Sequence, residues 1–494
     1  GEVRFSEVIR LVFQVLSIML SKFQSSDLPK DSHQVCASAA VGALEACLGR
    51  SLRPVEDARA SRFYATLLRC LNTAIMEGRG CHVPLLNKLA ILLPRFFLYG
   101  VHSTSVTAAP STGVGKAEVK YWDTRPSQSV LKVEGSQNAV AVKSAYVPPH
   151  VRLNKAKAVR PLASNSEDQR SRPREGRDSG WRESEESSSE TDTSDMENGT
   201  ASGGTFPADL HRSSRVRTAA LNTIQAIVRS DVKAVQPHIC SFLPLNSPLQ
   251  QHPRSPSLVT VLLYDPHAKV RSCAATAIGL LVDGPAQRAY LGVAEVRDTA
   301  SKALVRGFTP LSVQLGQMLV ALHAGLFRTI ETEPNFGVLV CAIRSLALLL
   351  SAAPYERLPV TLIPQAVSGI RSSLQKLLNF TNGTASASEN YHAAALSCLA
   401  AAFSTKLPSP ALAQALMRDT RPVSSGGSAR VPTLVHELLQ WASAGSPVVR
   451  VEALAALRGA FKTYPQIVAV CGSLASAFLN ALSLPSFPSA VQVR

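Results

Sequence analysis

Apolar and small residues recur along most of this chain at intervals of three and four, which is the spacing of one face of an α-helix. Such segments run from residue 1 to about 104 and again from about 206 to 494. Short stretches rich in Pro, Gly and Ser separate them, and the alternation with period two that a half-buried strand requires is absent. The pattern therefore predicts an all-α fold built from many amphipathic helices.

Two helices of the first region can be placed more closely. The segment 33–48 carries apolar or small residues with helical spacing, so we expect one face to be buried, made of Val35, Ala39, Gly42, Ala43 and Ala46. The segment 84–100 contains Pro94, which lacks an amide donor and clashes with the preceding turn. We expect this second helix to bend or break near Leu93.

A short signature, Val-Arg-x-x-Ala followed by an apolar stripe, occurs three times. The signature residues are Val216, Arg217 and Ala220, then Val270, Arg271 and Ala274, then Val449, Arg450 and Ala453. The stripes continue with Thr223, Ile224 and Ile227, with Ala277, Ile278 and Leu281, and with Ala456, Leu457 and Ala460. A looser copy begins at Val35. Because a small Ala lets backbones approach while larger aliphatics fill the groove, the signature predicts helices stacked side by side.

An acidic residue accompanies the second copy. Asp265 lies five residues before Val270, at the turn that precedes the helix. We expect a ladder in which turn Asp residues pair with Arg residues of neighbouring repeats, and in which this pairing satisfies Arg271 near the surface. The spacing Asp-(x4)-Val-Arg-x-x-Ala resembles the second helix of a HEAT repeat, a helix pair of roughly 40–47 residues.

Three longer blocks extend this resemblance, at 257–284, 307–316 and 339–358. In their order and spacing they look like the region of unknown function in the HEAT repeat-containing protein 6 family. The resemblance covers about 200–370, and the N-terminal helices fit the same family more weakly. It implies a HEAT/armadillo-type α-solenoid, a superhelix of stacked helix pairs, and it implies no enzyme activity.

Residues 105–205 give way to Ser, Pro, Arg and Glu. Such a segment cannot bury enough apolar surface to offset its chain entropy, so we expect a long disordered linker. Its charge is divided, with net +6 in 143–182 and net −7 in 183–200. The expected organisation is N-terminal helical repeats at 1–104, this linker, and HEAT-like helical repeats at 206–494.

The basic part of the linker contains the string YVPPHVR, a candidate linear motif. Its residues are Tyr146, Pro148, Pro149, His150 and Arg152. Two adjacent prolines limit the entropy lost on binding, which suits a docking peptide. The string is similar to an N-terminal motif of some DEAD-box RNA helicases that is linked there to the cap-binding translation initiation factor, with Val151 in place of a Leu. A plain linker is the alternative interpretation.

The acidic part of the linker contains three candidate phosphorylation sites, Ser187, Ser189 and Ser194, each followed three residues later by an acidic residue. This spacing suits an acidophilic kinase, and each phosphate would add about −1.5 to −2 charges. The alternative is a solvated acidic tract that neutralises the basic block beside it.

Nine cysteines are scattered along the chain, without a CxxC pair or a nearby His at zinc spacing. They predict buried, reduced thiols in an intracellular protein of the cytoplasm or nucleus, not a secreted one. The apolar segment 9–23 is too short to span a bilayer, and 337–353 carries Arg344 at its centre, so we expect no membrane insertion. The chain begins with Gly1 and not with Met, which suggests a fragment of a longer protein.

Catalytic chemistry is not predicted. The string STGVGKAE at 111–118 has Pro110 and Ala117 where a phosphate-binding loop needs a glycine and a hydroxyl. The eleven histidines are dispersed, and carboxylates are not paired in apolar surroundings that would tune an acid and a base. We therefore expect no catalytic, cofactor-binding or metal-binding residues, and no enzyme.

The net charge of +16, of which +12 falls on 201–494, bears on the partners. The signature arginines account for part of it. The leading hypothesis is a scaffold or adaptor that binds protein partners through the surface of an α-solenoid. The alternative is a nucleic-acid-associated factor that uses a basic solenoid face and the basic block at 143–182.

Overall fold

The computed structural model describes residues 2–22, 31–49, 54–55, 57–78, 80–101, 207–245, 256–296, 309–378, 385–405, 408–422 and 430–471. These residues are almost entirely helical, as the hydropathy pattern predicts. The linker expected at 105–205 lies outside them. Among the described helices, none combines the length and the apolar character needed to cross a bilayer.

The longer helices are α1 (Glu2–Lys22), α2 (Ser32–Leu48), α3 (Ala58–Glu77), α6 (Pro207–Ser230), α10 (Ala268–Val282), α12 (Leu311–Thr332), α13 (Phe336–Ala352), α14 (Leu362–Leu378), α15 (Ala385–Phe403), α17 (Thr433–Ala444) and α18 (Pro447–Thr463). The shorter ones are α4 (Leu86–Leu92), α7 (Val232–Val235), α8 (Ile239–Phe242), α9 (Leu258–Tyr264), α11 (Pro285–Leu291), α16 (Pro410–Arg418) and α19 (Pro465–Val470), with 3-10 turns η1 (Val83–Leu85), η2 (Leu93–Phe96) and η3 (Gln236–His238).

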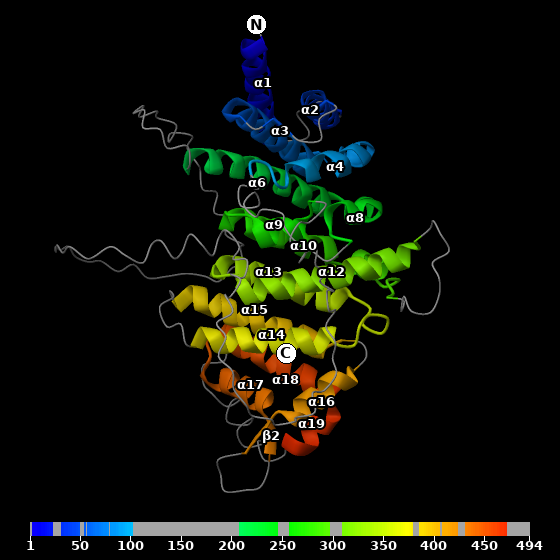
Figure 1. Cartoon of the computed structure of the whole chain (residues 1–494), viewed down its shortest axis with the longest axis vertical. Coiled ribbons are helices and arrows are strands. Elements are labelled where there is room, and N and C mark those ends of the chain that lie inside the picture. The colour runs from blue at the N-terminus through cyan, green and yellow to red at the C-terminus, as the bar shows by residue number, and fades with distance from the viewer. Residues whose placement is uncertain are drawn as a thin grey trace, which may run out of the picture.

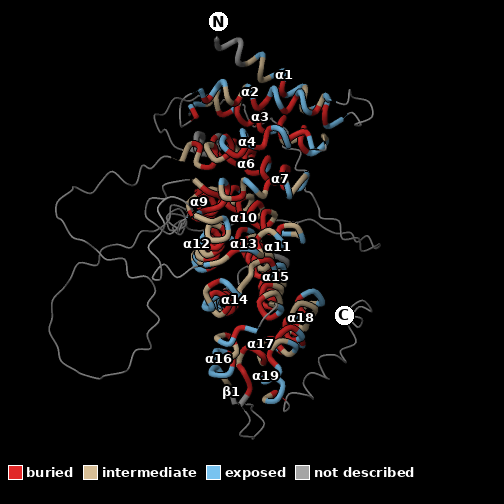
Figure 2. The backbone as a smooth tube through the Cα atoms, turned by 90° about the vertical axis from the view of Figure 1, so that its right-hand side faces the viewer, coloured by how far each residue is buried: buried red, intermediate tan, exposed pale blue. Residues whose placement is uncertain are grey.

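The helices are stacked in chain order along the long axis of the molecule (Figure 1). One set, which we call the inner helices, forms a continuous column in which each member packs on the next: α1, α3, α6, α10, α13, α15 and α18. A second set, the outer helices, packs beside them, with α2 on α3, α9 on α10, α12 on α13, α14 on α15 and α17 on α18. The side view separates α12 and α14 from α13 and α15 as two parallel columns (Figure 2).

The signature residues account for the close packing of the inner column. Every position of the three predicted stripes is buried. Two hydroxyls of inner helices hydrogen-bond to the backbone of the preceding inner helix. Thr223 Oγ1 donates to the Leu68 carbonyl at 3.2 Å, and Ser345 Oγ donates to the Ala275 carbonyl at 2.6 Å. Such bonds require backbones that nearly touch, which small residues permit.

The two predicted helical regions form one stack. Helix α6, which opens the second region, packs directly on α3 of the first. The break predicted at Pro94 is confirmed, because α4 ends at Leu92 and a 3-10 turn covers Leu93–Phe96. This turn brings Tyr99 back under α6, where its hydroxyl lies 2.9 Å from the Val55 carbonyl.

The buried face predicted for 33–48 is wrong. Val35 is 63% exposed, and Ala39, Gly42 and Ala46 are exposed as well. The residues that face the core are Cys36, Ala37, Ala40, Val41, Leu44 and Leu48. Helix α2 is small or apolar on nearly all sides, so the period of its apolar residues does not identify the side that packs.

A small strand pair also departs from the purely helical expectation. Strands β1 (Thr420–Pro422) and β2 (Arg430–Pro432) pair in antiparallel fashion, with Thr420 opposite Pro432. Each strand has three residues, too few to show a period in the sequence. The hairpin joins α16 to α17 and leaves the helical architecture unchanged.

Two glycines provide a matched test of this packing. A Cβ on Gly316 in α12 would meet the Glu295 carbonyl oxygen at 2.0 Å, whereas one on Gly369 in α14 would meet no atom within 4 Å. We expect Gly316→Ala to destabilise the protein by about 1–3 kcal/mol because backbone must shift. Gly369→Ala should stabilise it by about 0.5–1 kcal/mol through helix propensity. Urea unfolding midpoints measure both, and shifts of the same sign would contradict the packing described.

Candidate functional site

The first signature arginine lies in a completely buried ion pair. Arg217 Nε is 2.6 Å from Asp265 Oδ2, Nη2 is 3.2 Å from Oδ1, and both side chains are 0% exposed. Arg217 Nη1 also donates to the Tyr99 carbonyl at 2.6 Å and to Ser213 Oγ at 3.1 Å. One guanidinium therefore joins the turn after η2, helix α6 and the turn between α9 and α10.

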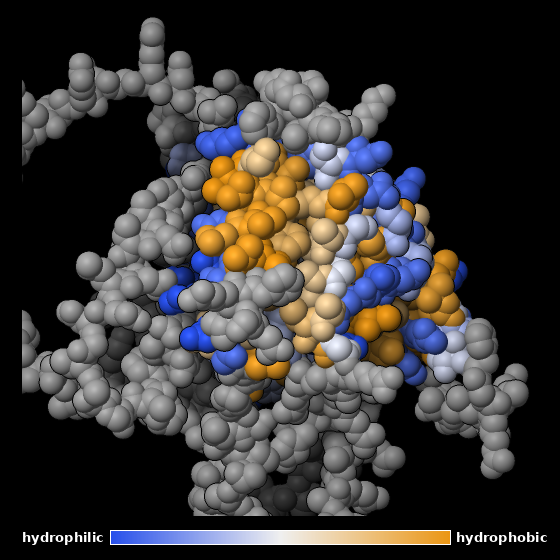
Figure 3. All heavy atoms as spheres, turned by 90° about the horizontal axis from the view of Figure 1, so that it is seen from above, coloured by the Kyte–Doolittle hydropathy of each residue, from blue (hydrophilic) through white to orange (hydrophobic). Residues whose placement is uncertain are grey.

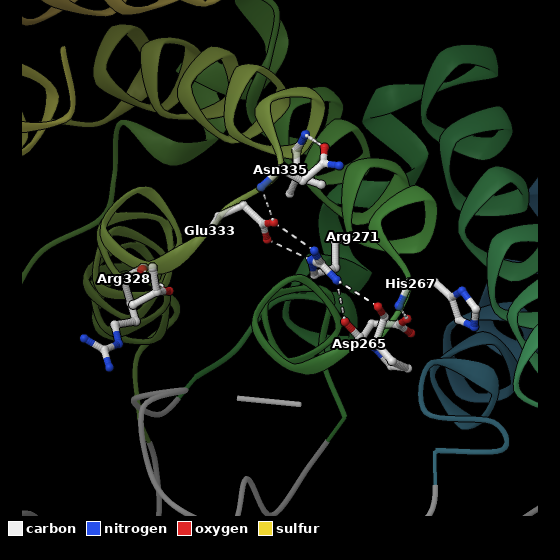
Figure 4. Close-up of polar contacts among 9 residues, drawn as sticks. Asp265, His267, Arg271, Arg328, Glu333 and Asn335 are labelled. Carbon is white, nitrogen blue, oxygen red and sulfur yellow. Dashed lines mark hydrogen bonds and ion pairs between the residues drawn. The ribbon is translucent and has the colours of Figure 1, made fainter. Parts of the chain in front are cut away.

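The second signature arginine repeats this arrangement one step further along the column (Figure 4). Arg271 donates from Nε and Nη2 to the two carboxylate oxygens of Glu333, each at 2.8 Å. Its Nη1 donates to the Asp265 carbonyl at 2.9 Å and to the Pro266 carbonyl at 3.2 Å. Arg271 and Glu333 are both almost fully buried.

Each acid of this ladder also shapes its own turn. Asp265 Oδ1 accepts from the His267 amide at 2.8 Å, just before α10 begins. Glu333 Oε1 accepts from the Asn335 amide at 3.0 Å, and Asn335 in turn caps α13 through the Val338 amide. The carboxylate thus fixes the entry into one inner helix while it neutralises the arginine of the preceding inner helix.

The expected environment of Arg271 is wrong in one respect. Arg271 is buried and not near the surface, and its carboxylate partner is Glu333. Asp265 meets Arg271 only through its backbone carbonyl, since its side chain pairs with Arg217. A buried charge of this kind is tolerated only with a partner and with further hydrogen bonds, which is why three or more acceptors surround each guanidinium.

The position of Glu333 reveals a fourth copy of the repeat. Glu333 precedes Val338 by five residues, as Asp265 precedes Val270, and Ala342 stands where the signature has its Ala. Val338 and Ala342 are fully buried, and Leu339 replaces the arginine. The sequence contains this copy as the spacing acid-(x4)-Val-x-x-x-Ala, without the Val-Arg pair of the other three.

The third signature arginine has a different environment. Arg450 is 8% exposed, and its Nη2 donates to the Ser443 carbonyl at 3.2 Å at the end of α17. A separate ion pair also involves α17: Arg371 of α14 donates from Nε and Nη2 to Glu437, each at 2.9 Å, and it also contacts Asp419. The hydrogen bond from Arg371 lowers the pKa of Asp419.

A buried histidine of α12 faces the turn after α13. His323 Nδ1 is 2.7 Å from the Leu319 carbonyl and Nε2 is 2.7 Å from the Tyr355 hydroxyl. This geometry fits the neutral tautomer in which Nδ1–H donates and Nε2 accepts. Complete burial lowers the pKa of His323 to about 4. Both nitrogens are engaged within the core, so His323 supports packing and has no atom directed at a ligand.

Two thiols lie close together in a way that the sequence did not indicate. Cys36 Sγ of α2 and Cys70 Sγ of α3 are 3.4 Å apart and buried. The hydrogen bond between them and burial raise the pKa of Cys70. Of the nine cysteines, Cys47 is exposed. Within the described residues, no group of three metal-ligating side chains occurs.

The open side of the inner column is basic. Each inner helix packs against its neighbours and the outer layer, and exposed or half-buried polar residues recur at helical spacing on the remaining side, as with Arg62, Thr66 and Arg69 on α3 or Arg215, Thr218, Asn222 and Arg229 on α6. Arg215 and Lys269 occupy the same place, directly before the Val of their signatures. We call this side, from α3 to α18, the open face; its cations are Arg62, Arg69, Arg215, Arg229, Lys269, Arg344, Arg458 and Lys462.

The candidate linear motif and the candidate phosphorylation sites lie outside the described residues, within 102–206. They are Tyr146, Pro148, Pro149, His150 and Arg152, and Ser187, Ser189 and Ser194. The candidate functional site is therefore the open face, together with the buried ion pairs that hold its helices in register.

Breaking one buried pair tests its role. Asp265→Ala leaves Arg217 charged and buried, so we expect a loss of about 3–5 kcal/mol in unfolding free energy. The double variant Arg217→Met, Asp265→Leu should recover most of that loss, because an apolar pair carries no desolvation penalty. Glu437→Ala, in the half-exposed cluster, should cost less than about 1 kcal/mol. Equal losses for Asp265→Ala and Glu437→Ala in urea unfolding would contradict the assignment.

The buried His323 predicts a specific pH dependence. The folded chain keeps His323 neutral down to pH about 4, whereas the unfolded chain protonates it near pH 6.5. Its stabilising contribution is therefore complete above about pH 6.5 and is lost as the pH falls towards 4, by roughly 3 kcal/mol. His323→Gln should remove this part of the acid destabilisation. Unfolding free energies at about pH 7 and about pH 4.5 test it; an equal acid loss in both proteins would refute it.

Comparison with known proteins gives a partial match. Residues 215–412 match a family model described as a domain of unknown function (DUF4042). The match spans both buried ion pairs, from Arg217 to Glu333, and leaves out α17 to α19 and the N-terminal helices. No solved structure matches the chain. In this region the chain is similar to that uncharacterised domain.

Proposed function

We propose that this protein is a non-enzymatic scaffold or adaptor, a HEAT/armadillo-type α-solenoid that binds protein partners across the open face. The observation that carries the proposal is the continuous column of inner helices, held in register and presenting one long basic side. Stacked repeats of this kind bind extended partners through many separate contacts. A surface of this type serves recognition and requires no catalytic group.

The chemistry of the buried polar groups supports a structural use for them. Arg217, Arg271 and His323 are engaged by carboxylates, carbonyls or a hydroxyl of the same chain. Perturbed groups at catalytic sites line a cleft and face the substrate. Here the buried donors face other elements of the stack, which favours a scaffold over an enzyme.

The family proposal is finer than the match to the domain of unknown function. We propose membership of the HEAT repeat-containing protein 6 family, on the blocks at 257–284, 307–316 and 339–358. The matched range 215–412 includes all three blocks. Apart from Cys47, the described cysteines are buried or half-buried, which suits the reduced thiols of an intracellular protein.

A second candidate function, nucleic-acid binding, draws on the same basic side. The arginines of the buried pairs are not part of the open face. Its cations lie on α3, α6, α10, α13 and α18. Among the inner-helix residues beyond α1 whose burial is described, the exposed or half-buried acids are Glu77, Glu389 and Glu452, and Glu389 accepts from Ser446 Oγ. Among the described residues of the open face no exposed aromatic side chain accompanies these cations, so acidic protein segments fit the surface better.

Charge reversal on the open face tests the function. Arg69→Glu with Arg344→Glu should weaken the binding of partners captured from cell extract by more than about tenfold, because two attractive contacts become repulsive. Lys233→Glu with Arg288→Glu, on α7 and α11 away from the open face, is the matched control. All four residues are exposed, so folding should be unchanged. Quantitative mass spectrometry of pull-downs measures the effect.

Nuclease and salt separate the two functions. Protein partners that survive nuclease and depend on Arg69 and Arg344 support the scaffold. A partner set that collapses with nuclease, with affinity falling steeply as salt rises, supports the nucleic-acid factor, since phosphate contacts release counterions. Equal loss of partners in the control pair would contradict the open face as the binding surface.

A further inference from the structure

The first helix of the column exposes an apolar stripe. On α1 six apolar residues at helical spacing are 40–58% exposed, namely Val8, Leu11, Val12, Val15, Ile18 and Met19. The view onto this end of the molecule shows a patch of apolar residues (Figure 3). Isolated exposed apolar residues are ordinary on a protein surface, but a contiguous stripe marks an interaction site.

The stripe lies where other inner helices are covered. Phe13 and Leu20 of α1 are buried, and Ser17 Oγ lies 3.2 Å from Thr73 Oγ1, so this side faces α3. The polar side of α1 is separate and contains Arg10 and Gln14, which are hydrogen-bonded to each other. Helix α1 therefore has a side that packs on α3, a polar side and the apolar stripe. The stripe corresponds to the two remaining sides of an inner helix, where the other inner helices pack against an outer helix and against the preceding inner helix.

Helix α2, which contacts α1, presents a second exposed stripe. Val35, Ala39, Gly42 and Ala46 are exposed, and a Cβ on Gly42 would meet no atom within 4 Å. Small residues of this kind let a neighbouring helix approach closely. An outer helix elsewhere in the stack contacts other outer helices as well as its inner partner, as α12 contacts α9, α13 and α14.

The rest of the stack indicates what covers these stripes. Inner helices α3, α10, α13, α15 and α18 each pack against the outer helix that precedes them. Among the described helices none occupies that place beside α1 and over α2. We propose that the α1 and α2 stripes bind a further outer-type helix, an amphipathic helix with an apolar face that extends the same array beyond α1.

This occupant fits better than a second copy of the chain. A helix in the outer position touches the α1 stripe and the α2 stripe together, as α12 touches α13 and α14. Pairing of α1 with α1 of a second copy would cover the first stripe and would not use the small-residue surface of α2. The surface formed by the α1 and α2 stripes is also distinct from the open face, so a negative result for one proposal does not contradict the other.

Fusions of the chain's own outer helices test the proposal. In one, α12 with its connector (residues 311–335) is placed directly before Glu2, and in the other α17 with its connector (residues 433–446). Each connector joins an outer helix to its inner helix in the stack. We expect amide exchange in α1 to slow by at least about tenfold in one or both fusions, and binding of an apolar dye to fall. The control carries α12 with Leu315, Leu319, Leu322 and Leu326 changed to Gln, which removes its buried face.

Point variants locate the effect on the stripe. In the protected fusion, Val12→Lys with Val15→Lys should abolish the protection of α1, whereas Gln14→Lys, on the polar side, should retain it. Failure of both fusions to slow exchange would overturn the proposal. A stable dimer of the unfused chain in sedimentation, made monomeric by Val12→Lys with Val15→Lys, would identify a second copy as the occupant and would also overturn it. The Arg69→Glu, Arg344→Glu variant should leave these results unchanged.

Discussion

The buried pairing of an inner-helix arginine with the turn acid of the next inner helix constrains the rest of this structure. Removing two charges from water costs more than most pairs regain, so Arg217 and Asp265 add little to stability compared with an apolar pair of similar volume. What they contribute is the register of the helices, that is, the position at which each inner helix packs along its neighbour. An inner helix stacked one turn out of place would leave a buried guanidinium opposite aliphatic side chains, at a cost of several kcal/mol. The pair therefore selects one stacking among several that the apolar surfaces alone would accept.

Close approach of the helices follows from the same constraint. Arg271 reaches Glu333 and the Asp265 carbonyl at once because small residues bring α10 and α13 together, with Gly279 of α10 against Ser345 of α13. In the fourth copy Leu339 replaces the arginine, and α13 meets α15 through apolar contacts such as the edge-to-face pair of Phe336 and Tyr391. Stability in such an array is a sum over neighbouring interfaces. The buried ion pairs connect α6 with the turn before α10, and α10 with the turn before α13. The register of the helices is therefore most strictly specified in this part of the column.

The sequence predicted the inner helices well and their partners poorly, for physical reasons. The stripes after Val216, Val270 and Val449 follow one helical period with polar residues opposite, so their buried side is determined locally. Helix α2 has small residues on both sides, and its buried side depends on α3. Glu333 lies 62 residues from Arg271, and no local pattern links them until the stack is formed. The fourth copy at Val338 lacks the Val-Arg pair because Leu339 stands at the arginine position. What all four copies share is the small residue four places after the Val and the apolar stripe that follows.

The two kinds of exposed surface follow from how the column is built. Along its length, each inner helix uses its apolar sides for its neighbours and leaves a polar side open, and exposed or half-buried cations of α3, α6, α10, α13 and α18 lie there. At its end, α1 packs one apolar side against α3 and keeps a polar side open, but the sides that carry the exposed apolar stripe have no neighbour among the described helices. Charge on the open face suits reversible contact with an extended partner, since charged surfaces tune encounter and specificity more than affinity. The apolar end suits permanent packing, because uncovered it exposes surface that water disfavours. If both proposals hold, one repeat design provides a surface for a reversibly bound partner along its side and a surface for a further helix at its end.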